Sequence, residues 1–212
     1  MNPDLDLRER AELCDLLDRL GPDAPTLCHG WTTADLAAHL VVRERDLVGV
    51  PGILIGGKLG EITEKRMARE LEKGYRAVVA RVRSGPPFGP LRLAPLRAQV
   101  NLAEYVVHHE DVRRANALGR RTDREDLDAA VWPRLARMGL LLMRKTRPVG
   151  VVLRRADDGA QARAVPGTSA VTITGHPVEL LLFMFGRNGA AEVELDGTAD
   201  DVARVRRTKF GV

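Results

Sequence analysis

The spacing of apolar residues changes near residue 145, and this change constrains the fold more than any other feature of the sequence. Before it, apolar residues recur at helical intervals, as the leucines of 13–20 do. After it, short runs such as 170–174 alternate valine or isoleucine with threonine, the period of a strand with one buried face. We therefore expect an α+β protein in which a helical domain, 1–120, precedes a small α+β domain, 121–212.

Four helices are expected in the first domain. They cover residues 5–20, 33 to about 48, about 61–83 and about 96–117. Gly21-Pro22 ends the first helix, Thr32 or Thr33 caps the second, and a glycine-rich connection occupies 49–60. Four helices joined by loops in about 120 residues predict a helical bundle.

A linking helix of about 123–144 opens the second domain. Thr122 and Glu125 have the spacing of a capping box at its start, and we expect Pro133 to kink the helix or restart it. The remaining pattern predicts strands at 149–153, 170–174 and 191–195, a compact helix at 177–185 and a last helix at 200–207.

The charge of the chain is nearly balanced. It carries 33 basic and 29 acidic side chains, a net charge of +4, and neither domain holds a basic excess typical of nucleic-acid binding. No apolar run reaches the roughly 18 residues of a membrane span, and the N-terminus lacks an apolar signal segment. We therefore expect a cytoplasmic protein that contacts neither nucleic acid nor membrane.

One face of the fourth helix carries the residues with the most chemistry. Asn101, Glu104, His108 and Asp111 fall within about 80° of one another on the helix surface. A carboxylate and an imidazole four residues apart can reach one point, and together they suit Zn²⁺, Fe²⁺ or Ni²⁺. His39 lies among apolar residues of the second helix and is the candidate third ligand.

Other interpretations of these residues remain open at this stage. Glu104 and His108 have the spacing of an ordinary helical ion pair, and His39 has the setting of a buried core histidine. His109 points about 100° away from its neighbour, so we expect it at the surface or behind a ligand. Glu110, Arg113 and Arg114 are expected on the solvated face of the helix.

The two cysteines and Trp31 favour simple packing roles. Cys14 and Cys28 form no CxxC pair, and a cytoplasmic protein keeps its thiols reduced. We therefore expect both to behave as small buried apolar residues. Trp31 precedes the second helix and is expected to anchor the loop that enters it.

Three segments resemble a known family. They are CHGWTTADLAAHL at 28–40, EYVVHHEDVRRA at 104–115 and GHPVELLLFMFGR at 175–187. The first two resemble the N-terminal domains of mycothiol-dependent maleylpyruvate isomerases, which belong to the DinB-like superfamily of metal-binding four-helix bundles. The phrase VHHEDVRRA is similar to an actinobacterial-type, metal-binding branch, and the third segment resembles the C-terminal domain that often follows.

The resemblance implies a metal site and a thiol chemistry. It implies that His39, Glu104 and His108 bind a divalent ion, usually zinc, with Asp111 and Asn101 supporting the ligands from outside. It also implies a thiol such as mycothiol that adds to a small electrophile, giving isomerisation or conjugation. Arg187 then either pairs with a carboxylate of the thiol or substrate, or is a cation at a helix C-terminus.

Two classes of function follow. The first is a metal- and thiol-dependent transferase or isomerase that acts on small molecules. The second is a non-catalytic metal-binding or ligand-sensing protein, in which the ion serves stability or regulation. Either function is compatible with a monomer or a homodimer, and the ligand types do not distinguish zinc from nickel or iron.

Overall fold

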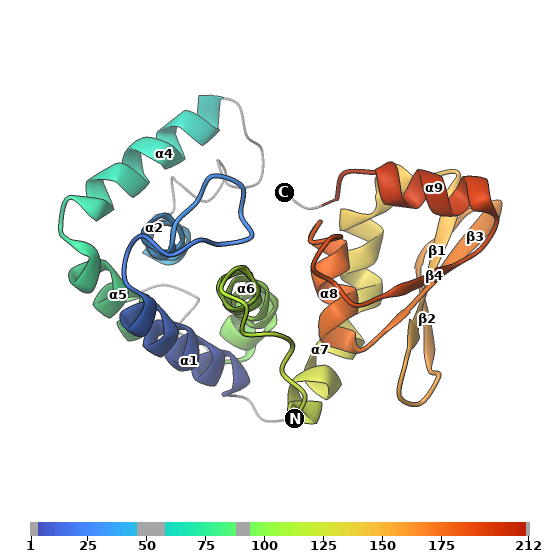
Figure 1. Cartoon of the computed structure of the whole chain (residues 1–212), viewed down its shortest axis with the longest axis horizontal. Coiled ribbons are helices and arrows are strands. Elements are labelled where there is room, and N and C mark those ends of the chain that lie inside the picture. Colours follow the sequence, from blue (N-terminus) through green and yellow to red (C-terminus); the bar gives the residue numbers. More distant parts are fainter. Residues whose placement is uncertain (1–3, 46–57, 88–93, 211–212) are drawn as a thin grey trace. The chain divides into compact units, whose positions relative to one another are not determined.

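The computed structural model describes residues 4–45, 58–87 and 94–210. The chain divides into two compact units, residues 1–120 and 121–212 (Figure 1). Within the described ranges, every helix is too short or too polar to span a lipid bilayer. Helices and a small four-stranded sheet together confirm the expected α+β class.

The first unit is helical. Its described helices are α1 (Leu5–Leu20), α2 (Thr33–Arg45), α4 (Lys58–Leu71), α5 (Tyr75–Ser84) and α6 (Ala94–Ala115). Helix α1 packs against α5 and α6, and α2 packs against α4 and α5. Fully buried residues from these helices form the core, among them Leu13, Leu17, Leu36, Leu40, Val78 and Tyr105.

The start of α2 follows its sequence signal. Oγ1 of Thr32 accepts from the backbone N–H of Asp35 at 3.4 Å, so Thr32 caps the N-terminus as expected. In return, the backbone N–H and the hydroxyl of Thr32 donate to Oδ2 of Asp35, at 2.9 and 2.8 Å. The end expected near Val48, and the glycine-rich connection as far as residue 57, lie outside the described residues.

The expected third helix, 61–83, is instead two helices. Helix α4 ends at Leu71 and α5 begins at Tyr75, with Gly74 between them at φ 86°. That left-handed conformation cannot continue a helix and strongly favours glycine. The apolar spacing of the sequence runs through this break, so the pattern alone predicted one helix.

The second unit combines four helical segments with the sheet. Its elements are α7 (Glu125–Leu142), a 3₁₀ turn (Arg144–Thr146), β1 (Val149–Arg155), β2 (Gln161–Val165), β3 (Ser169–Gly175), α8 (Pro177–Met184), β4 (Glu194–Asp196) and α9 (Ala199–Arg207). The strand order is β2-β1-β3-β4, with β1 parallel to β3 and the outer strands antiparallel. Helix α7 packs on α8 and β2, while α9 packs on β1 and β3.

Several local predictions for this unit are wrong. Arg124, not Thr122, precedes α7, and no side chain caps its N-terminus. Pro133 lies inside one continuous helix, so the expected restart does not occur, while the alternative of a kink stays a prediction. Strand β2 was missed because its sequence, QARAV, is short and half exposed, without a clear alternation. The strand expected at 191–195 is confined to Glu194–Asp196.

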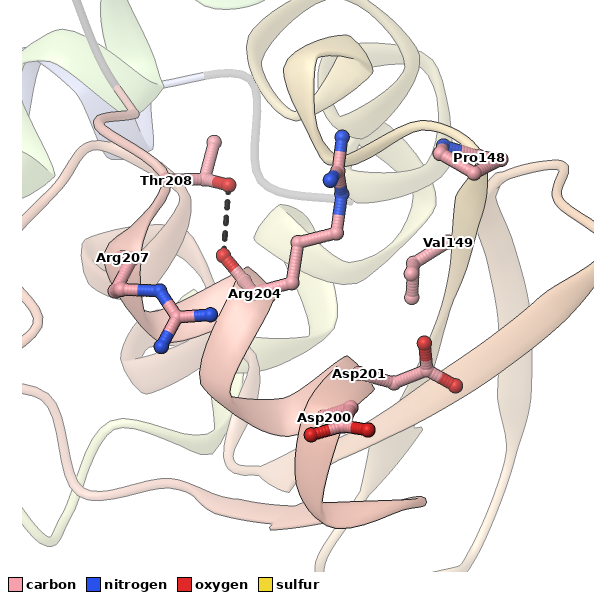
Figure 2. Close-up of a pocket in the computed structure, with 7 residues that line it drawn as sticks. All are labelled: Pro148, Val149, Asp200, Asp201, Arg204, Arg207 and Thr208. Atoms are coloured by element: carbon pink, nitrogen blue, oxygen red, sulfur yellow. Dashed lines mark hydrogen bonds between the residues drawn. The ribbon is translucent and has the colours of Figure 1, made fainter.

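A pocket lies between the start of β1 and helix α9 (Figure 2). Hydrogen bonds beside it connect α9 with the segment that precedes β1. Arg204 donates from Nε to the carbonyl oxygen of Thr146, at 2.8 Å. The hydroxyl of Thr208 donates to the carbonyl oxygen of Arg204, also at 2.8 Å. Asp200 and Asp201 lie in the first turn of α9, where negative charge stabilises the helix dipole.

Candidate metal centre

Helices α2 and α6 bring three donor atoms together. Oε1 of Glu104 lies 3.4 Å from Nε2 of His39 and 3.2 Å from Nε2 of His108. One donor atom from each residue lies within 4.8 Å of the other two. Donor atoms about 2.1 Å from a tetrahedrally bound ion are separated by about 3.4 Å, so the donor set and spacing fit a divalent metal.

The second ring nitrogen of His108 is held by Asp111. Nδ1 of His108 lies 2.9 Å from Oδ2 of Asp111, whose side chain is fully buried. A carboxylate that accepts the Nδ1 proton orients the ring and leaves Nε2 as the donor toward a metal. The contact has the geometry that the supporting role expected for Asp111 would require.

The surroundings of the three residues shift their pKa values in different directions. Burial lowers the pKa of His39, which favours the neutral imidazole that binds metals. Burial alone would raise the pKa of Glu104, but hydrogen bonds with His108 and His39 and the charge of Arg43 hold it well below its usual value. Glu104 is therefore ionised at neutral pH.

His108 has the opposite tendency. Burial alone would lower its pKa, but hydrogen bonds with Asp111, Cys28 and Glu104 raise it well above its usual value. In the absence of a bound cation, the ring is therefore protonated on both nitrogens and lies between the carboxylates of Glu104 and Asp111. A metal that binds at Nε2 must displace a proton from this ring.

Cys28 lies beside His108, where the sequence predicted only packing. Its Sγ donates to Oδ2 of Asp111 at 3.2 Å and lies 3.9 Å from Nδ1 of His108. A backbone hydrogen bond from Leu27 to the carbonyl oxygen of Asp111, at 3.2 Å, fixes the loop there. Cys28, His108 and Asp111 thus form a second group of possible donors. Cys14, in contrast, is fully buried as expected.

Trp31 packs beside the site. Its ring centroid is 5.0 Å from that of His39, and its side chain lies against the hydrophobic core. This agrees with the packing role expected from the sequence. A partly buried indole beside His39 also limits the access of water to that imidazole.

The neighbouring His109 faces away from the site and into the α1–α6 contact. Its Nδ1 lies 3.1 Å from Oε2 of Glu9, which is fully buried. The expected solvated face of α6 is also partly buried, because Glu110 is 1% exposed and accepts from Nε of Arg114 at 2.8 Å. Spacing along one helix could not reveal the burial of His109, because its partner Glu9 lies on α1.

The remaining predicted residues lie in different places. Asn101 is fully buried one turn before Glu104, and its carbonyl accepts from Nη1 of Arg43 at 2.8 Å. Arg187 belongs to the second unit, just beyond the end of α8. Its Nη1 donates to the carbonyl oxygen of Phe185, at 2.6 Å.

The fold is shared with solved structures, although the sequence matches no family model and no curated protein. A crystal structure of the mycothiol-dependent maleylpyruvate isomerase matches with a TM-score of 0.60 and 17% identity, over 93% of this chain and 91% of that chain. The chain has the fold of that isomerase. A histidine-to-alanine mutant of the isomerase matches with the same values. The likeness to the isomerase covers both units, helical and α+β.

Proposed function

We propose that this protein binds a divalent metal, zinc above all, and uses it for thiol-dependent isomerisation or transfer on a small electrophile. The observation that carries the proposal is the approach of two imidazole nitrogens to one carboxylate oxygen, at 3.4 and 3.2 Å, from two separate helices. Two imidazole nitrogens and a carboxylate oxygen are a ligand set that suits a divalent ion. The likeness to a mycothiol-dependent isomerase supports a thiol as the second component.

The residues of the chain would divide the work. His39 offers a neutral nitrogen, and Glu104 offers an ionised oxygen that lowers the charge of the bound ion. Asp111 keeps the proton of His108 on Nδ1, so that Nε2 faces the site. A divalent ion, when bound, supplies the positive charge that lowers the pKa of a coordinated thiol. Three protein ligands leave a position for such a thiol.

A thiol and an electrophile also need contacts beyond the three ligands. We propose Arg187 for a carboxylate of the thiol or of the substrate, since guanidinium groups bind carboxylates in a bidentate manner. One of its amino groups already donates to Phe185, which holds the side chain in place. Conversion of Arg187 to lysine keeps the charge and removes the bidentate geometry, so it should weaken thiol or substrate binding while metal content stays the same.

Calorimetry tests the thiol component directly. Mycothiol is titrated into zinc-loaded protein, into metal-free protein and into the zinc-treated His39→Ala variant. The proposal expects saturable binding at micromolar to millimolar concentrations to the zinc-loaded protein alone. Absence of thiol binding to a protein that holds stoichiometric zinc would contradict the enzyme and favour a metal-binding or sensing role.

A further inference from the structure

A continuous series of polar contacts runs from α1 to the candidate ligand Glu104. Arg10 donates from Nη1 and Nη2 to the two carboxylate oxygens of Glu44, both at 2.6 Å. Nδ2 of Asn101 donates to Oε1 of Glu44 at 2.8 Å, and Oδ1 of Asn101 accepts from Nη1 of Arg43 at 2.8 Å. Nε of Arg43 lies 3.2 Å from Oε1 of Glu104.

The contacts among Arg10, Glu44 and Asn101 are shielded from solvent, whereas the side chains of Arg43 and Glu104 are 13% and 18% exposed. Arg10 is 3% exposed, Glu44 is 8% exposed and Asn101 is fully buried. Buried charges are tolerated when they are paired and hydrogen-bonded, and here two arginines alternate with two carboxylates. Each charged side chain is balanced by an opposite charge, so a substitution at one residue alters the contacts of its neighbour in the series.

The amide of Asn101 has one possible orientation between its two charged neighbours. Its carbonyl oxygen must face Arg43, which can only donate, and its amino group must face Glu44, which can only accept. Glu44 thus fixes the orientation of the amide, and the amide in turn fixes the guanidinium of Arg43. Arg43 holds the oxygen of Glu104 that the two histidines approach.

We infer that Glu44 is a positioning residue that sets the metal affinity of the Glu104 site without touching it. It acts through Asn101 and Arg43, which lie between Glu44 and Glu104. This inference rests on the proposed metal binding. The carboxylate of Glu44 accepts from the amide of Asn101 and so keeps the carbonyl oxygen of that amide turned toward Arg43.

The test compares Co²⁺ and Zn²⁺ affinities of the full chain with those of Glu44→Gln, Asn101→Ser and the double variant. Loss of a residue that supports a ligand from outside typically weakens metal binding about 10- to 100-fold, and we expect at least the lower figure for each single variant. Asn101→Ser interrupts the series of polar contacts without changing the charge. If Glu44 acted through its charge alone, the metal affinity of this variant would stay unchanged. The double variant should bind no more weakly than the weaker single variant, since both interrupt the same series of contacts.

Asp6→Asn is the matched control. Asp6 lies on α1, is 1% exposed and accepts from Nε of Arg97 at 2.7 Å, so its conversion also removes a buried, paired carboxylate. It should lower stability but leave the Co²⁺ absorption spectrum and the affinity unchanged. Circular dichroism checks that each variant folds. If Glu44→Gln does not fold, Asn101→Ser carries the comparison.

The outcomes are separable. If the parent protein binds metal and both single variants bind it as tightly as Asp6→Asn does, the positioning role is overturned while the proposed function stands. Losses in the two single variants that add fully in the double variant also contradict one connected series of contacts. A parent protein that binds no metal overturns the proposed function and this inference together.

Discussion

His108 and Asp111, one helical turn apart on α6, meet at 2.9 Å between Nδ1 and Oδ2. The same oxygen accepts a hydrogen bond from Cys28 at 3.2 Å. One oxygen of Asp111 therefore receives two contacts, from the buried ring of His108 and from the partly exposed thiol of Cys28. Its carboxylate fixes which nitrogen of His108 faces His39 and Glu104.

Conversion of Asp111 to asparagine should weaken zinc binding about 10- to 100-fold, because an uncharged amide oxygen replaces the carboxylate that accepts from Nδ1 of His108 and orients its ring. Competition with a chromophoric chelator measures the affinity. Asp128→Asn is the control, since Asp128 also lies beside a histidine, with Oδ2 3.4 Å from Nδ1 of His176, but in the second unit. Equal zinc affinities of the two variants would contradict the role of Asp111.

The two cysteines should differ in reactivity. Burial raises the pKa of Cys14 to about 12 and its side chain is fully buried, so it stays a protonated, inaccessible thiol at pH 8. Cys28 is partly exposed. Iodoacetamide labelling followed by peptide mass mapping should find Cys28 alkylated in the native protein and Cys14 only after denaturation. Labelling of both at one rate would contradict this packing.

His109→Ala should separate stability from metal binding. The substitution leaves the buried carboxylate of Glu9 without the imidazole that lies 3.1 Å away, and loss of such a charged hydrogen bond costs about 2 kcal/mol. Urea denaturation measures the free energy of unfolding, and elemental analysis measures zinc. We expect a lower stability with unchanged zinc content, whereas loss of zinc would place His109 in the metal centre.

Stability should fall above pH 10, in part through Tyr75. Burial raises the pKa of Tyr75 to about 12, and its hydroxyl donates to the carbonyl oxygen of Leu17 at 2.8 Å. Between about pH 10 and about pH 12 the unfolded state loses this proton while the folded state retains it, so unfolding becomes easier as pH rises. In Tyr75→Phe the decline of unfolding free energy over this interval should be shallower; an identical slope would contradict the assignment.

The sequence alone predicted the three candidate ligands and their convergence. Helical spacing places Glu104 and His108 on one face, and the apolar surroundings of His39 place that residue in a bundle core. The structure brings these faces together at 3.4 Å or less. Period-two alternation likewise predicted β3, because that strand has regularly alternating burial.

Other features depend on contacts that no local pattern records. Cys28 lies in a loop, so no periodicity connects it with His108, 80 residues later. His109 is buried by Glu9, 100 residues earlier, and only the packing of α1 on α6 creates that pair. The break at Gly74 was missed because the apolar residues on both sides keep helical spacing. A single glycine in such a pattern does not by itself reveal a left-handed conformation.

The most direct measurement is the metal content, by mass spectrometry, of untagged protein, beside the His39→Ala and His108→Ala variants. We expect close to one divalent ion per chain in the parent protein, lost in both variants and retained in His109→Ala. Absence of metal in the parent protein, even after reconstitution with zinc, nickel and iron, would contradict it. His39, Glu104 and His108 would then be a buried polar cluster, and the thiol chemistry built on it would fall.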